Sequence, residues 1–241
     1  MSGLHGDRAA QHGNDHQGDH QHADHWHGDG PHDEATSEAF WDHRYQCSST
    51  LWSGQVNPQL MTEARDLSPG SALDVGCGEG ADAIWLAQRG WRVTAVDVST
   101  VALERGAAHA LEVSVEVAQR ITWLHAELTV WVPPAASYDL VSAQFMHLPK
   151  VQREGLHSRL AESVAPGGTL LVVGHHPSDL QTAVPRPSVA GLLFTAFEVA
   201  DSLPKEQWVI VVDEARARQA LDPDGNAATI HDAVLRAERV R

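Results

Sequence analysis

The hydrophobic and polar positions divide the chain into two unlike parts. From Leu4 to Glu34 the residues are mostly His, Asp, Gly and Gln, and Leu4 and Trp26 are the only large apolar side chains. A segment this poor in apolar groups buries too little surface to offset the backbone entropy that folding removes. We therefore expect residues 1–36 to form a disordered tail and residues 37–241 to form one folded domain.

From residue 37 onward, short apolar runs alternate with stretches of helical spacing. This alternation predicts strands at 71–75, 91–98, 121–125, 138–145 and 169–175, and helices at 59–67, 81–87, 99–110, 149–164 and 196–202. Strands and helices in this order are typical of a doubly wound α/β fold with a parallel sheet. Two more apolar strands, at 208–216 and 228–239, flank a turn and predict a C-terminal antiparallel hairpin. Three prolines predict a loop at 177–191.

Aromatic residues are concentrated at the start of the domain, within residues 37–68. Phe40, Trp41 and Tyr45 lie close together, and Trp52 follows shortly before Asn57. Because these residues fall outside any long periodic run, they predict a short helix and a loop that pack onto the rest of the domain.

A glycine-rich turn joins the first predicted strand to the helix that follows it. The turn is Gly76–Gly80, and the next strand along the chain contains Asp97 near its end. A strand, glycine turn, helix and strand with such an acid is the pattern of a site for a nucleotide-type cofactor. Glycines let a ligand approach the backbone closely, and the helix start supplies N–H donors. Asp97 is placed to accept hydrogen bonds from a ribose diol.

Two kinds of ligand are compatible with the spacing of this turn. Gly76, Gly78 and Ala81 satisfy the dinucleotide pattern, so an NAD(P)-dependent oxidoreductase is one alternative. However, Asp74 and Glu79 would repel a pyrophosphate in a partly dry site. The same carboxylates would stabilise a cationic ligand without phosphates. S-adenosylmethionine, which carries an ammonium, a sulfonium and a ribose, fits that description.

The segments Leu73–Gly80 and Val93–Ser99 resemble motif I and the acidic second-strand motif of the class I S-adenosylmethionine-dependent methyltransferases. The similarity extends over about residues 38–240 and implies a seven-stranded, Rossmann-like sheet. Within this superfamily, the aromatic residues at the start of the domain resemble those of the thiopurine, tellurite and thiol methyltransferases. In that group the N-terminal aromatic segment closes over the cofactor. The resemblance thus implies methyl transfer to a small-molecule acceptor, for which a thiol or chalcogen compound is a candidate.

The same resemblance implies which residues bind the cofactor. Asp74 would orient its ammonium group, Asp97 would bind the ribose hydroxyls, and Val98 would flank the adenine. Glu127 stands where many relatives have an Asp that contacts the adenine amino group, and it is one methylene longer. The full set of candidate cofactor-binding residues is Asp74, Gly76, Cys77, Gly78, Gly80, Asp97, Val98, Glu127 and Gln144.

The candidate acceptor site lies where the strands at 138–145 and 169–175 end. Ligands of open α/β sheets bind beyond the carboxyl ends of the strands, and Gln144, Phe145, His147, His175 and His176 follow these ends. His147 is the candidate general base, because an imidazole titrates near neutral pH. His175 and His176 are adjacent on a strand, so at most one of them faces the site. The candidate acceptor-binding residues are Tyr45, Trp52, Phe145 and His175.

Composition and charge exclude several classes of function. Acidic residues outnumber basic ones by 32 to 17, giving a formal charge of −15, so nucleic acid and anionic membranes are poor partners. The chain has no apolar run near the roughly 20 residues that span a bilayer, and its first residues are unlike a secretory signal. Its 2 cysteines rule out a disulfide framework. We therefore expect a cytoplasmic protein.

Histidine is the one residue type in clear excess, and half of it lies in the tail. Of 16 histidines, eight lie before residue 37, together with seven carboxylates and one arginine. Imidazoles and carboxylates at mixed short spacings chelate Zn²⁺, Ni²⁺ or Cu²⁺ weakly. The candidate metal ligands are His16, His20, His22, His25 and His27. A solvated low-complexity tail and a metal-handling protein are the two alternative readings of this segment.

We predict that deleting residues 1–36 removes most of the binding of Zn²⁺ measured by isothermal titration calorimetry, because the candidate ligands are concentrated there. Two results together would contradict a metal role for the tail: the truncated protein binds as many metal ions as the full chain, and cells that express it keep the same metal tolerance.

Overall fold

The computed structural model describes residues 37–49, 51–186 and 191–241. The tail predicted at 1–36, with the candidate metal ligands His16, His20, His22, His25 and His27, lies outside the described residues. Within the described ranges, no helix has the length and apolar character needed to cross a bilayer.

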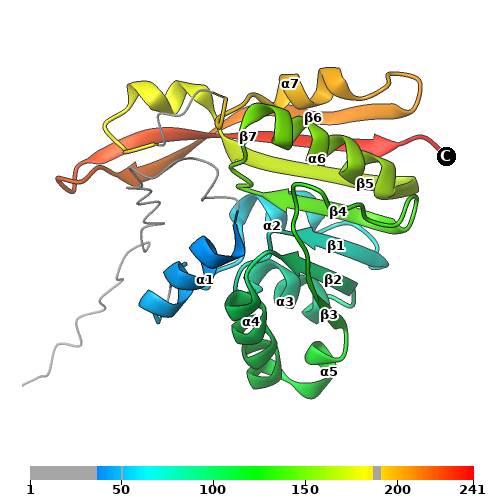
Figure 1. Cartoon of the computed structure of the whole chain (residues 1–241). Helices are drawn as coiled ribbons and strands as arrows, with labels where there is room; N and C mark the ends of the chain where they lie inside the picture. Colours follow the sequence, from blue (N-terminus) through cyan, green and yellow to red (C-terminus); the bar gives the residue numbers. More distant parts are fainter. Residues whose placement is uncertain (1–36, 50, 187–190) are drawn as a thin grey trace, which may run out of the picture.

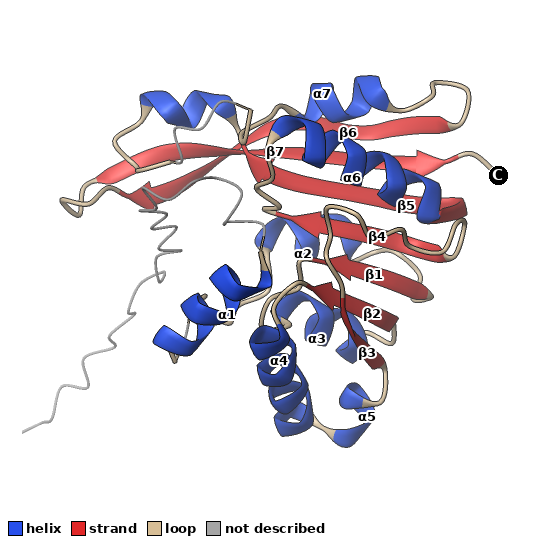
Figure 2. Ribbon diagram, in the orientation of Figure 1, coloured by secondary structure: helices blue, strands red, loops and turns tan. Residues whose placement is uncertain are grey.

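A single seven-stranded sheet runs through the middle of the domain (Figure 2). Its strands are β1 (Ser71–Val75), β2 (Arg92–Asp97), β3 (Ile121–His125), β4 (Tyr138–Gln144), β5 (Val164–His175), β6 (Trp208–Leu221) and β7 (Ala227–Arg239). The spatial order is β3-β2-β1-β4-β5-β7-β6, with parallel pairs from β3 to β5 and antiparallel pairs at β5–β7 and β6–β7. The predicted mostly parallel sheet with a C-terminal hairpin is confirmed.

Helices cover both faces of this sheet. They are α1 (Glu38–Cys47), α2 (Pro58–Ala64), α3 (Ala81–Gln88), α4 (Thr100–Val113), α5 (Val115–Ala118), α6 (Lys150–Ser163), α7 (Ala196–Ser202) and the 3-10 helix η2 (Pro177–Gln181). Residues of α2, α3 and α5 belong to one hydrophobic cluster, and residues of α6 and α7 belong to the other.

The alternation of side chains along each strand supplies both clusters. On β5, Leu170 and Val172 belong to the cluster with α6, whereas Leu171 and Val173 belong to the cluster with α3. Successive side chains of a strand point to opposite faces, so a strand covered on both faces must be apolar throughout. This explains why the strands appear in the sequence as continuous apolar runs.

The start of β5 differs from the sequence prediction. The turn expected at 165–168 lies inside the strand, which begins at Val164 and not at residue 169. Tyr138 pairs with Val164 and Leu140 pairs with Thr169, so the extra residues of β5 bulge out between two paired positions. A bulge accommodates extra residues without ending a strand, which the Pro and Gly residues alone did not reveal.

Three other boundaries also differ. Helix α4 continues to Val113, and β6 continues to Leu221, because the tight turn Asp222–Asn226 lets the hairpin pair as far as Ala227. The segment predicted as a loop at 177–191 begins with η2.

The hairpin of β6 and β7 extends beyond the end of its neighbour β5. His175, the last residue of β5, pairs with Asp232, and the part of β7 before Asp232 pairs with β6 alone. We call this part, residues 216–232, the arm. It projects on the side of the molecule where α1 lies (Figure 1), which is the carboxyl edge of the parallel strands.

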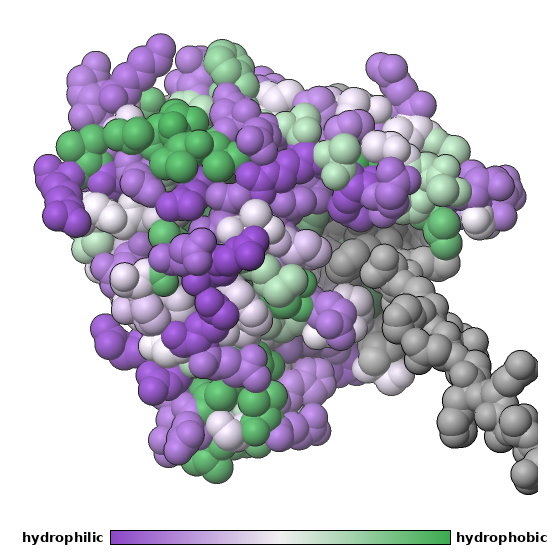
Figure 3. All heavy atoms as spheres, turned by 180° about the vertical axis from the view of Figure 1, so that it is seen from behind, coloured by the Kyte–Doolittle hydropathy of each residue, from purple (hydrophilic) through white to green (hydrophobic). Residues whose placement is uncertain are grey.

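Strand β6 forms one edge of the sheet. Its residues Val209, Ile210 and Val211 are exposed, and the register shifts between Ile210 and Val212. Such an irregularity bends an edge strand and opposes pairing with another chain. Seen from behind, hydrophobic side chains gather in separate patches on a mostly hydrophilic surface (Figure 3).

We predict that Leu171→Ala lowers the free energy of unfolding by about 2–5 kcal/mol, because it leaves a cavity in the centre of the sheet. Leu171 is 0% exposed. Leu111 of α4 is 58% exposed, so Leu111→Ala should stay within about 0.5 kcal/mol of the wild type. Urea unfolding of both variants measures the difference, and equal losses would contradict the two placements.

Candidate active site

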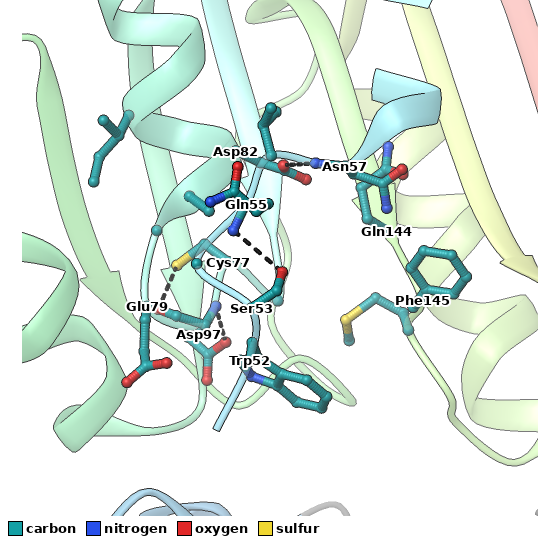
Figure 4. Close-up of a pocket in the computed structure, with 18 of the residues that line it drawn as sticks. Trp52, Ser53, Gln55, Asn57, Cys77, Glu79, Asp82, Asp97, Gln144 and Phe145 are labelled. Carbon is teal, nitrogen blue, oxygen red and sulfur yellow. Dashed lines mark hydrogen bonds between the residues drawn. The ribbon is translucent and has the colours of Figure 1, made fainter. Parts of the chain in front are cut away.

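A cavity of about 820 Å³ opens at the carboxyl edge of the sheet (Figure 4). It lies between the aromatic segment, the glycine turn and the ends of β4 and β5. Twelve of the fourteen residues predicted for cofactor, acceptor or catalysis line it: Tyr45, Trp52, Gly76, Cys77, Gly78, Gly80, Asp97, Val98, Gln144, Phe145, His147 and His175. The fold thus brings together residues more than 100 positions apart in the chain.

The glycine turn is held to the end of β2 by backbone hydrogen bonds. The N–H groups of Gly76 and Cys77 donate to the carbonyl oxygen of Val96 at 2.8 and 3.1 Å. Gly78 has a φ of +52°, and a Cβ there would lie 2.9 Å from the hydroxyl oxygen of Tyr45. Glycine is therefore required at this position by both the backbone conformation and the close approach of the aromatic segment.

Asp97, at the end of β2, organises the loops around it. One carboxylate oxygen accepts a hydrogen bond from the N–H of Gly78, and the other accepts one from the N–H of Ser99, both at 2.8 Å. Burial raises the pKa of Asp97, and these N–H donors oppose the increase. A carboxylate has further lone pairs after two such bonds, so Asp97 can also accept from a ligand diol.

Two more acids lie beside Asp97. Asp82, in the first turn of α3, lines the cavity and accepts a hydrogen bond from the N–H of Asn57 at 2.7 Å. Burial raises the pKa of Asp82 to about 6. Asp74 is buried beneath the cavity without lining it, and burial together with Asp82 and Asp97 raises its pKa well above the usual range.

These acids favour a positively charged ligand. Among the described residues, one carboxylate oxygen of Asp74 has no hydrogen-bond partner. Three neighbouring carboxyl groups with raised pKa values disfavour one another's ionisation, and a bound cation would relieve this. The sequence analysis missed Asp82, although an acid directly after a glycine turn at a helix start was a usable signal.

Helix α1 is attached to the start of α4. Asp42 of α1 accepts hydrogen bonds from the hydroxyls of Ser99 and Thr100 at 2.6 and 3.2 Å. Because Ser99 also binds Asp97, one chain of hydrogen bonds connects α1 to the cavity.

Arg105 of α4 makes a second attachment. Its guanidinium donates to the carbonyl oxygens of Tyr45 and Ser48 at 2.7 and 2.9 Å and pairs with Glu79 at 3.0 Å. The aromatic segment is thereby held against both α4 and the glycine turn. Arg105 was not identified from the sequence, because only the tertiary contacts distinguish it from other helix arginines.

The aromatic segment covers the cavity with packed rings. The indole N–H of Trp52 donates to the hydroxyl oxygen of Tyr45 at 2.8 Å, and the ring of Trp41 lies 6.3 Å from that of Trp52. Burial and the nearby Asp97 raise the pKa of Tyr45 above its usual value, so it remains a neutral phenol.

The opposite wall consists of rings from the ends of β4 and β5. Phe145 has a φ of +53°, which is a strained conformation for a bulky residue and is often found at functional sites. Its ring lies 4.8 Å from that of His175, which stacks on His147 at 4.7 Å. Beside them, the side-chain oxygen of Gln144 is buried without a hydrogen-bond partner among the described residues.

Two predicted positions lie away from the cavity wall. Glu127 is exposed and accepts a hydrogen bond from the hydroxyl of Thr129, while Leu128 and Thr129 line the cavity in its place. His176 follows the last residue of β5, caps the start of η2 and bonds to Ser178, and it is absent from the residues that line the cavity.

The arm adds two lining residues that the sequence analysis missed, Arg218 and Asp232. No local motif marks them, since they reach the cavity only because the hairpin extends past β5. Across residues 37–49, 51–186 and 191–241, no group of three or more His, Cys, Asp or Glu side chains is arranged to hold a metal ion.

Comparison with known proteins gives the family of the central part of the chain. Residues 72–168 match the family described as "Methyltransferase domain". An uncharacterized methyltransferase of Mycobacterium bovis is 36% identical over 124 residues, which is 51% of this chain and 59% of that protein. The chain thus matches about three fifths of the length of this relative.

Two solved structures share the fold. One, described as "Conversion of a Disulfide Bond into a Thioacetal Group during Echinomycin Biosynthesis", has a TM-score of 0.63 at 18% identity and covers 84% of this chain and 91% of its own. The other, TehB from Haemophilus influenzae, has a TM-score of 0.62 at 19% identity and covers 83% of this chain and 66% of its own. These two likenesses show the fold alone. The match of residues 72–168 to a methyltransferase domain supports the predicted resemblance to the class I S-adenosylmethionine-dependent methyltransferases.

We predict that Asp82→Asn stabilises the ligand-free protein at about pH 7.5. The pKa of Asp82 is raised from 3.8 to about 6, so the folded state holds the proton more tightly than the unfolded state and loses stability as pH rises through 6. The increase in the free energy of unfolding that Asp82→Asn produces should become smaller as the pH falls from 6 toward 4. Urea unfolding of both proteins across this range measures it, and a pH-independent difference would contradict the prediction.

Proposed function

We propose that this protein transfers the methyl group of S-adenosylmethionine to a small-molecule acceptor. The observation that carries the proposal is the group of three carboxyl groups, Asp74, Asp82 and Asp97, packed at a glycine turn beside a cavity. Such a site favours a ligand with an ammonium, a sulfonium and a ribose. A dinucleotide would bring its pyrophosphate toward the same carboxylates, which disfavours the oxidoreductase alternative.

Each group of the cofactor has a suitable partner in this chain. Asp97 would accept hydrogen bonds from the ribose hydroxyls, and Asp74 and Asp82 would hold the ammonium. The backbone of Gly76–Gly80 would lie along the methionine portion, where a side chain would obstruct it. The contact between Glu127 and the adenine stays a prediction, and the exposed position of Glu127 gives it no support.

When bound, the cofactor supplies an electrophilic methyl group: the acceptor's lone pair bonds to its carbon while the sulfur–carbon bond breaks and leaves its electron pair on sulfur. The protein's part is alignment and exclusion of water, which together can contribute up to about 7–11 kcal/mol. Trp41, Tyr45 and Trp52 cover the site for this purpose, and Arg105 holds their segment in place.

A thiol or chalcogen compound is the acceptor class that we favour, on the resemblance of the aromatic segment to enzymes of that group. A thiolate arrives without its proton and needs no base. For an oxygen or nitrogen acceptor, His147 in the cavity wall would take the proton. As parts of the same proposal, the protein acts in the cytoplasm, and its tail binds divalent metal weakly.

Titration calorimetry with S-adenosylhomocysteine and with NAD⁺ tests the proposal. We expect binding of S-adenosylhomocysteine, weakened at least tenfold by Asp97→Ala. The exposed Asp213 on β6 offers a matched control, and Asp213→Ala should leave binding unchanged. Tight NAD⁺ binding without S-adenosylhomocysteine binding would overturn the proposal. Release of S-adenosylhomocysteine across thiols, chalcogen oxyanions, phenols and amines then identifies the acceptor.

A further inference from the structure

The arm places an arginine in the wall of the cavity. Arg218 lies opposite Ile230 in the arm, and Asp232 lies opposite both Arg216 and His175. Directly paired residues share a face of a sheet, and so do residues two apart on one strand. Arg218, Asp232 and His175 are therefore on one face, and all three line the cavity.

The guanidinium of Arg218 is held in place from behind. Its Nε atom donates to both carboxylate oxygens of Asp232, at 3.0 and 3.1 Å, and the side-chain amide of Gln59 donates to one of them at 3.1 Å. Asp232 is 2% exposed, whereas the side chain of Arg218 is 25% exposed. The carboxylate thus receives hydrogen bonds from two side chains, and the arginine is the more exposed member of the pair.

The hydrogen bonds of Arg218 within the described residues all use Nε. Its two Nη groups remain as donors, and the guanidinium presents them in a planar fork that matches the two oxygens of a carboxylate or another oxyanion. A buried carboxylate that fixes an arginine lowers the entropy lost when that arginine binds an anion.

The guanidinium of Arg218 lies near residues that were predicted to bind the acceptor. His175 pairs directly with Asp232 across the strands, and the ring of His175 contacts that of Phe145. The cofactor side of the cavity carries Asp82 and Asp97, which would repel an anion, so an anionic group has its favourable contact at the arm.

We propose that Arg218 is a specificity-determining residue that binds an anionic group of the methyl acceptor. The acceptor is then a small molecule that carries a carboxylate or similar oxyanion separate from the atom that is methylated. The inference rests on the proposed function for the identity of the reaction, whereas the anion site itself depends only on Arg218, Asp232 and Gln59.

Matched pairs of acceptors test the proposal in the full-length protein. The probes are 3-mercaptopropionate and its methyl ester, and 4-hydroxybenzoate and its methyl ester; in each pair the ester lacks the negative charge and carries one more methyl group. For the pair that the protein methylates, we expect kcat/KM to be at least tenfold higher for the acid than for the ester. Arg218→Gln should remove this preference and change the rate with the ester by less than threefold.

Three variants keep the result interpretable. Arg120→Gln removes an exposed arginine that lies outside the cavity and has no contact with Asp232 or Gln59, and should keep the preference for the acid. Arg218→Lys should restore part of it. If Arg218→Gln fails to fold because Asp232 is left without its partner, Arg218→Gln with Asp232→Asn removes both charges and provides the test.

A binding measurement separates this proposal from the proposed function. Titration calorimetry of 3-mercaptopropionate into the protein, with and without S-adenosylhomocysteine, should show binding that Arg218→Gln weakens at least tenfold. This binding without any methyl transfer would support the anion site and count against the methyltransferase proposal. Methyl transfer with equal rates for acid and ester, or anion binding unchanged by Arg218→Gln, would overturn the anion site.

Discussion

The carboxylate of Asp97 is the contact on which the site depends. Through two hydrogen bonds it joins the glycine turn after β1 to the start of α4 after β2. Ser99, one of its partners, also binds Asp42 of α1. This buried side chain thereby connects the turn and the helix start, and through Ser99 the aromatic segment, while Arg105 makes a second connection between the same three parts.

The three buried acids that favour a positively charged ligand also lower the stability of the folded protein. Asp74, Asp82 and Asp97 all have raised pKa values because burial disfavours their charged forms, and the charges of Asp82 and Asp97 raise the pKa of Asp74 further. A protein that needed only to fold would hold such groups in water or pair them with cations. Keeping them together lowers the stability of the folded protein, and a positively charged ligand that binds beside them offsets this cost.

The two ends of the domain complete a site that the central sheet begins. The aromatic segment comes from residues before β1, and the arm comes from the last two strands. Under the proposed function, the central unit binds the cofactor, so variation in the two flanking pieces would change the acceptor without disturbing the cofactor. Under the two proposals, the carboxyl groups of Asp82 and Asp97 serve the cofactor and the guanidinium of Arg218 serves the acceptor.

The sequence by itself determined the strand and helix order, the glycine turn and the position of Asp97 beside that turn, because periodicity and backbone conformation are local properties. It also placed Phe145, His147 and His175 at the site, since strand ends meet at one edge of a parallel sheet. Only the tertiary structure decided that β5 begins with a bulge, and that Asp82 lies among other acids. Likewise, Arg218 reaches the cavity because β7, its partner in the hairpin, pairs with the distant strand β5, and this pairing leaves no mark on the residues around Arg218.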